Sequence, residues 1–354
     1  MPPTGRSEVT TASPAGTSAP RDDRFDRAHA ALLGLAIGDA LGMPTQDLPR
    51  STVRRLYGDL RWFEPGPEAN AISRGLPAGR TTDDTDQALL VARALVDGDG
   101  HVRPERLAHD LLAWEARMVA AGSHDLLGPS TRRALAALAD GADPSGTGRR
   151  GDTNGAAMRI APVGVAVTPH PLDRLVDRVA ETSVLTHDTG VAVAGASAVA
   201  AAVSTGVLGG TFADVLDAAV LAARAGATRG AYVPGADVAT RIVWAVDLVR
   251  AARSEEDALD AVAYLVGTGL ATQESVPAAF ALLALTPHDP WRACLAAAGL
   301  GGDSDTVAAM VGAVGGALHG TAVFPGEAAA LVTRVNDLDL VPLVGELLAL
   351  RDAA

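Results

Sequence analysis

The chain has 354 residues, of which 48% are hydrophobic and only 3% aromatic, and its formal net charge at pH 7 is -13. This length and apolar content suffice for a large core, which must be built mainly from Ala, Leu and Val. The negative charge disfavours general binding to nucleic-acid backbones or anionic membranes, because such binding relies on clustered Lys and Arg. Cys294 is the only cysteine; this excludes an intramolecular disulfide, and its apolar surroundings predict a buried helical thiol without a catalytic role.

Residues 1–24 are rich in Ser, Thr, Pro, Gly and charge and contain no apolar stretch, so they are predicted to be a disordered leader and not a signal peptide. Residues 25–354 contain no linker and no repeat of 20 to 50 residues, which predicts one globular domain. The most apolar later stretch, 191–203, is too short to span a bilayer. We therefore expect a cytoplasmic protein, and the lack of coiled-coil heptads favours a monomer.

The abundance of Ala and Leu, both strong helix formers, predicts an all-α fold. Helical patterning begins near residue 27 and runs to residue 42. A long irregular connection is expected over 43–80 and a flexible surface loop over 141–151. Strand candidates are few and short, such as 163–167. Further helices are expected at 84–97, 104–121, 129–140, 172–185, 189–205, 211–225, 236–252, 255–267, 275–285, 290–298, 304–318, 326–335 and 340–351.

The first predicted helix carries Gly34, Gly38 and Gly42 at intervals of four residues. Residues with this spacing share one face of a helix, and glycines on that face let another backbone approach closely. Asp39 lies in the middle of this apolar helix, where an unpaired carboxylate would be costly. It therefore needs a partner, for example an Arg or a helix end.

Two acidic clusters of similar composition lie near opposite ends of the chain, each just before a run of helix-forming residues. They are Thr82-Asp83-Asp84-Thr85 and Asp303-Ser304-Asp305-Thr306. Either cluster alone is typical of a helix start, where Asp and Thr cap and the helix dipole favours carboxylates. Their recurrence suggests two halves of one metal site, because four carboxylates gathered in a fold need a cation or solvent to hold them. Such oxygen ligands suit Mg2+, Mn2+ or Ca2+, whereas zinc favours His and Cys.

Five motifs of the chain occur in an order that is specific when taken together, although each alone is a weak signal. They are Gly38-Asp39-Ala40-Leu41-Gly42, Thr82-Asp83-Asp84-Thr85, Asn154-Gly155-Ala156-Ala157-Met158-Arg159, Thr186-His187 and Gly301-Gly302-Asp303-Ser304-Asp305-Thr306. In this order they resemble the signatures of the ADP-ribosylglycohydrolases, the superfamily of the dinitrogenase-reductase-activating glycohydrolase. The resemblance extends from about residue 28 to about residue 320.

The resemblance implies a compact, single-domain orthogonal bundle of helices with a cleft that holds two Mg2+ or Mn2+ ions and the ribose of an ADP-ribosyl group. Breaking a glycosidic bond of ribose builds oxocarbenium character, which carboxylates stabilise, and a water held by the ions would attack. The implied metal ligands are Thr82, Asp83, Asp84, Asp303, Asp305 and Thr306. The residues that the resemblance assigns to catalysis are Asp83, Asp84, Asp303, Asp305 and Gln46.

Asp39 would then support the metal site from behind, by a hydrogen bond to metal-bound water or to a ligand. The implied substrate-binding residues are Asn154, Gly155, Met158, Gln46 and His187. For 151–155 the resemblance implies that backbone N–H groups hold a pyrophosphate. The alternative is an ordinary turn followed by a helix start. Packing or capping is the alternative for His187.

Gln46 stands in a loop where many family members have glutamate. A glutamine binds a ribose hydroxyl or a base, but it neither protonates a leaving group nor acts as a base. Asp47 is adjacent and could take that role.

We therefore expect a hydrolase that removes ADP-ribose from an acceptor side chain of a modified protein by metal-activated water. The amide at Gln46 leaves open a hydrolase of free ADP-ribose derivatives or nucleosides. A third hypothesis is a non-catalytic, metal-dependent ADP-ribose-binding protein. The complete set of metal ligands argues against it. The acceptor, Arg, Ser or a small molecule, and the choice between Mg2+ and Mn2+ are left open.

Overall fold

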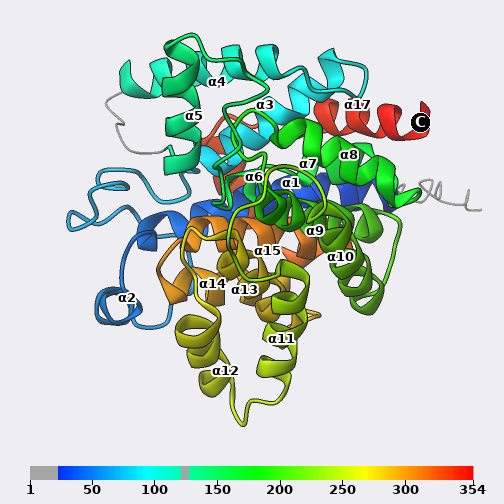
Figure 1. Cartoon of the computed structure of the whole chain (residues 1–354). Helices are drawn as coiled ribbons and strands as arrows, with labels where there is room; N and C mark the ends of the chain where they lie inside the picture. Colours follow the sequence, from blue (N-terminus) through cyan, green and yellow to red (C-terminus); the bar gives the residue numbers. More distant parts are fainter. Residues whose placement is uncertain (1–22, 121–126, 354) are drawn as a thin grey trace, which may run out of the picture.

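The computed structural model describes residues 23–120 and 127–353, and in these ranges it contains helices and no β-strand. The predicted all-α fold is confirmed. Helices α1 (Asp23–Gly42), α9 (Gly190–Val207) and α15 (Ser304–His319) run through the middle of the molecule, with α4 and α5 above them and α11 and α12 below in Figure 1. The helix α1 starts within the segment predicted as a leader, and residues 1–22 lie outside the described residues.

The other α-helices surround these three. In chain order they are α2 (Arg50–Tyr57), α3 (Asp83–Asp97), α4 (Pro104–Ala120), α5 (Pro129–Ala139), α6 (Gly155–Met158), α7 (Ala161–Ala166), α8 (Leu172–Ser183), α10 (Phe212–Gly226), α11 (Val238–Arg250), α12 (Glu255–Ala261), α13 (Thr272–Leu285), α14 (Pro290–Leu300), α16 (Gly326–Val335) and α17 (Leu340–Ala353). Short 3-10 turns span Met43–Thr45 and Thr321–Val323, and a π-helical turn, Val262–Val266, extends α12.

The glycine-bearing face of α1 packs directly on α15. A Cβ atom on Gly34 would lie 2.2 Å from the carbonyl oxygen of Gly312, and one on Gly38 would lie 1.9 Å from that of Ala308. The predicted close approach of a second backbone is therefore confirmed. The two helices run antiparallel, because contacts further along α1 meet residues earlier in α15. This direction brings the end of α1 to the start of α15.

Helix α9 has 18 residues and is long and apolar enough, by length and composition, to cross a membrane, but 83% of it is buried inside the protein. The prediction that the apolar stretch 191–203 is too short to span was wrong about its length, because the helix continues to Val207. Burial among the other helices accounts for its apolar sequence without a membrane.

Helix α7 occupies the place of the strand predicted at 163–167, and that prediction was wrong. Pro162 lies in the first turn, where a proline favours a helix start. The segment also packs closely on α9, since a Cβ atom on Gly164 would lie 2.6 Å from the carbonyl oxygen of Ala200. Burial against a helix thus outweighs the strand preference of the valines.

Helix α2 interrupts the connection that was predicted to be irregular over 43–80. Its sequence has few apolar residues to mark a helix, and it forms ion pairs with a distant part of the chain. The buried guanidinium of Arg50 forms ion pairs with Asp260 and Glu256, and Arg54 forms another with Glu256.

The C-terminal helix α17 is fixed by Arg351, which is almost fully buried. Its guanidinium donates to the backbone carbonyl oxygens of Val167 at 2.9 Å and Ser204 at 3.1 Å. Arginine thereby satisfies carbonyl groups at the ends of α7 and α9. In α14 the thiol of Cys294 is buried and lies 3.7 Å from the carbonyl oxygen of Ala308, so the predicted buried helical thiol is confirmed.

Candidate functional site

The antiparallel contact of α1 with α15 brings the two acidic clusters together at one pocket. Thr82 is the N-cap of α3 and Asp303 is the N-cap of α15. The first turns of both helices face a cavity of about 560 Å³. Its lining includes all four cluster carboxylates together with Gln46, Asp47, Thr131, Arg132, Thr153, Asn154, Gly155, Met158 and Thr306.

Asp39 lies beneath the start of α3 and is fully buried. Its carboxylate accepts hydrogen bonds from the backbone N–H groups of Thr82 at 2.9 Å and Thr85 at 3.1 Å, and from the hydroxyl of Thr85 at 2.5 Å. The partner that its burial required is therefore a helix end. Burial raises the pKa of Asp39 to about 7, although these hydrogen bonds oppose the shift.

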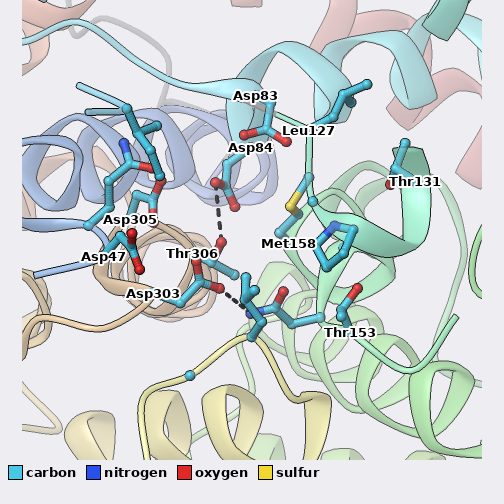
Figure 2. Close-up of a pocket in the computed structure, with 18 of the residues that line it drawn as sticks. Asp47, Asp83, Asp84, Leu127, Thr131, Thr153, Met158, Asp303, Asp305 and Thr306 are labelled. Atoms are coloured by element: carbon cyan, nitrogen blue, oxygen red, sulfur yellow. Dashed lines mark hydrogen bonds between the residues drawn. The ribbon is translucent and has the colours of Figure 1, made fainter. Parts of the chain in front are cut away.

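One threonine hydroxyl from each cluster contacts Asp84. Thr82 and Thr306, from different helices, donate to its Oδ2 atom at 3.1 and 3.3 Å, and Figure 2 shows the second of these contacts. The Oδ1 atoms of Asp84 and Asp305 are buried and have no hydrogen-bond partner. Burial, together with repulsion from neighbouring carboxylates, holds the pKa values of Asp83, Asp84 and Asp305 well above their usual range.

Asn154, predicted to bind substrate, lines the pocket and orients Asp303. Its amide donates to the Oδ2 atom of Asp303 and to the hydroxyl of Ser275, at 3.0 Å in the second case. Burial raises the pKa of Asp303 to about 6, although the hydrogen bonds from Asn154 and Thr306 lower it. Gly155 and Met158, also predicted to bind substrate, are buried and line the same pocket.

Gln46 and Asp47 both reach the pocket. Gln46 is 7% exposed, and its amide donates to the carbonyl oxygen of Met43 at 3.2 Å. Asp47 is exposed, and its φ of 57° places it in the left-handed region, which Asp tolerates better than most residues. A hydrogen bond from its N–H group to the carbonyl oxygen of Gly302 at 2.7 Å holds this conformation. Its carboxylate lies beside Asp303 and Asp305 in Figure 2.

His187, predicted to bind substrate, is fully buried and is absent from the lining of the pocket. Its Nε2 atom lies 2.9 Å from the hydroxyl of Thr153, which does line the pocket. Thr153 lies in the segment 151–155 that was predicted to hold a pyrophosphate through backbone N–H groups, but a role for its side chain was not predicted. Burial and the charges of Arg159 and Arg133 hold the pKa of His187 well below its usual range, so its ring is neutral.

The donor set fits a hard divalent cation, because the buried Oδ1 atoms of Asp84 and Asp305 lack partners and two threonine hydroxyls contact the other carboxylate oxygen of Asp84. Within the described ranges, however, no group of three or more His, Cys, Asp or Glu side chains is arranged to hold a metal ion. The oxygens therefore have the chemistry of metal ligands, but the carboxylates do not converge on one point.

We expect the protein in EDTA to be more stable at pH 6 than at pH 8. A carboxyl group whose pKa is raised by folding contributes stability below its unfolded pKa and loses it as pH rises through its folded pKa. Asp39, with a folded pKa of about 7, and Asp303, with one of about 6, titrate in or near this window. His187 acts in the opposite direction, but it is one group against five carboxylates. Denaturant titrations should show a difference of at least about 1–2 kcal/mol in the free energy of unfolding.

The variant Asp39→Asn is the matched control for this measurement. Asparagine keeps an acceptor oxygen for the start of α3 but does not titrate, so the pH dependence should shrink. An unchanged pH dependence in this variant would show that Asp39 does not contribute to it.

Carboxylates from two helix starts that face one pocket are suited to a hydrolase that stabilises a cationic sugar, as glycosidases do. The pattern that defines the ADP-ribosylglycohydrolase family matches residues 20–353, and the chain belongs to this family. The predicted family and the enzyme class, a glycosidase among the hydrolases, are confirmed.

Two relatives and one solved structure illustrate the similarity. The chain is 37% identical over 316 residues to the protein YegU of Escherichia coli (strain K12), across 89% of this chain and 94% of YegU. It is 30% identical over 315 residues to the ADP-ribosylarginine hydrolase Tri1 of Pseudomonas putida (strain GB-1), across 86% of this chain and 74% of Tri1. A chain of an ADP-ribosylglycohydrolase-related protein complex superposes with a TM-score of 0.68 at 27% identity, covering 94% of this chain and 99% of that one.

Proposed function

We propose that the protein is a Mg2+- or Mn2+-dependent hydrolase that releases ADP-ribose from an acceptor side chain of a modified protein. The observation that carries the metal dependence is the pair of buried, unpartnered oxygens on Asp84 and Asp305 at the acidic end of the pocket. The protein-linked substrate is supported by the family and by the name of the relative Tri1, an ADP-ribosylarginine hydrolase.

In this proposal the oxygens of Thr82, Asp83, Asp84, Asp303, Asp305 and Thr306 would hold two ions. When bound, the ions supply Lewis acidity and lower the pKa of a water molecule. The protein fixes the geometry: Asp39 anchors the first turn of α3, and Asn154 fixes Asp303. The carboxylates face the ribose, where they stabilise the developing positive charge. Asp47 at the pocket rim accepts or returns a proton at its carboxylate, which Gln46 does not do.

The test is mass spectrometry of a substrate panel incubated with Mg2+, Mn2+ or EDTA. The panel contains ADP-ribosyl-arginine and ADP-ribosyl-serine peptides, O-acetyl-ADP-ribose and common nucleosides. We expect metal-dependent release of ADP-ribose from at least one peptide, which would also identify the bond that is cleaved. Full turnover by a variant that lacks Asp303 would contradict the metal mechanism.

Release from small molecules alone would replace this proposal with a hydrolase of free ADP-ribose derivatives or nucleosides. No release from any member of the panel would favour a metal-dependent ADP-ribose-binding protein without turnover.

A further inference from the structure

A continuous chain of buried polar side chains links the acidic end of the pocket to Thr153. Gln87, Arg159, Thr186 and His187 form it, and each is at most 1% exposed. The amide of Gln87 donates to the Oδ2 atom of Asp83 at 2.8 Å, and its oxygen accepts from the guanidinium of Arg159 at 2.7 Å.

The second half of this chain continues from Arg159 to the pocket. Arg159 donates to the hydroxyl oxygen of Thr186 at 2.6 Å. The Nδ1 atom of His187 lies 2.7 Å from that same oxygen, and its Nε2 atom lies 2.9 Å from the hydroxyl oxygen of Thr153. Thr153 in turn lines the pocket.

The direction of these hydrogen bonds follows from the donor capacity of each group. A guanidinium has only donors, so the Thr186 oxygen accepts from Arg159. The hydroxyl proton of Thr186 then needs an acceptor, and the Nδ1 atom of His187 is the one in contact. The opposite tautomer, with the proton on Nδ1, would leave this buried hydroxyl proton unpaired, which is costly. The proton of His187 therefore lies on Nε2 and points at the oxygen of Thr153.

The His187 ring is neutral and fixed in place. Its burial and the neighbouring charges of Arg159 and Arg133 oppose a second ring proton. A Cβ atom on Gly155 would lie 2.7 Å from the Cε1 atom of the ring and 2.9 Å from Nε2, so the ring fills the space that a side chain there would need. Because Thr153 accepts from His187, its own hydroxyl proton remains for the pocket.

We propose that Thr153 is a substrate-binding residue that donates a hydrogen bond to an acceptor oxygen of the ADP-ribosyl group, and that His187 is a positioning residue that sets this direction. The identity of the ligand, ADP-ribose, is taken from the proposed function, on which this inference rests. In Figure 2 Thr153 lies with Thr131 and Met158 on the side of the pocket opposite Asp47, away from the carboxylates. A hydroxyl donor on that side complements the acceptor oxygens of ADP-ribose, which the carboxylates repel.

The test is calorimetric titration of the full chain with ADP-ribose in Mg2+. We expect Thr153→Val to weaken binding about five- to tenfold, the loss of one hydrogen bond. Thr153→Ser keeps the hydroxyl and should bind like the unmodified protein. His187→Leu removes the ring nitrogens at similar volume but leaves the Thr153 hydroxyl free to rotate, so it should weaken binding by less than Thr153→Val. Added to Thr153→Val, it should cost little more, because the hydroxyl that the ring orients is already gone.

Equal affinity of Thr153→Val and the unmodified protein would overturn the inference and leave the proposed function intact. No ADP-ribose binding by the unmodified protein would overturn both. Nitrogen-15 NMR of labelled histidine provides a readout without ligand: the expected spectrum has the His187 proton on Nε2. A proton on Nδ1 would reverse the direction of the chain and overturn the inference even if ADP-ribose binds.

Discussion

Asp305→Asn is expected to lower kcat/KM for ADP-ribose release by about 100- to 1000-fold and to raise the melting temperature of the metal-free protein. The Oδ1 atom of Asp305 is buried without a partner, and burial, together with repulsion from Asp84, Asp303 and Asp39, raises the pKa of this carboxyl group. An amide of nearly the same shape removes the repelled charge, which stabilises the folded chain. It also removes an oxygen ligand and the charge that would favour a cationic transition state.

The matched control is Asp86→Asn, in the same first turn as the cluster on α3. Asp86 is absent from the pocket lining, and its Oδ2 atom accepts from the indole of Trp114 at 2.9 Å, a bond that asparagine can keep. Activity and melting temperature of this variant should stay close to those of the unmodified protein. Steady-state kinetics with Mg2+ and thermal unfolding in EDTA check both values. A lower melting temperature for Asp305→Asn would mean that its carboxylate stabilises the fold, as an ordinary helix-start residue does.

The meeting of the two acidic clusters at one pocket was predictable from sequence, because their similar composition suggested two halves of one site. Asp39, a carboxylate within an apolar helix, also needed a partner, which the start of α3 provides. The glycine spacing of α1 likewise predicted a close backbone contact. It did not identify α15 as the partner or give the antiparallel direction, since a face of glycines fits many helices.

The parts that sequence reasoning missed depend on contacts between distant residues. Helix α2 forms ion pairs with α12, which no local pattern reveals. The role of His187 was predicted as direct contact with substrate, because a motif gives a residue type without its depth below the surface. The structure places Thr153 between the ring and the pocket. Asn154 was predicted to touch substrate, and its amide also holds Asp303, which lies 149 residues away.

Gly38→Ala is expected to destabilise the protein by at least about 3 kcal/mol, at the upper end of the usual cost of overpacking a core. The added Cβ atom would lie 1.9 Å from the carbonyl oxygen of Ala308 and 2.4 Å from its carbonyl carbon. Both are backbone atoms of a buried helix and cannot rotate away, so α1 and α15 must separate. Denaturant titration should show a lower midpoint with an unchanged slope.

Gly345→Ala is the matched control, since it makes the same chemical change within α17. Nothing lies within 4 Å of a Cβ atom at Gly345, so the higher helix propensity of alanine should stabilise the protein by up to about 1 kcal/mol. Changes of opposite sign in the free energy of unfolding of the two variants would show that the loss in Gly38→Ala comes from the steric contact and not from helix propensity. Equal stability of Gly38→Ala and the unmodified protein would contradict the tight contact of α1 with α15. Because that contact also positions Asp39 and Asp305 relative to each other, Gly38→Ala should lose activity at temperatures where it is still folded, and Gly345→Ala should not.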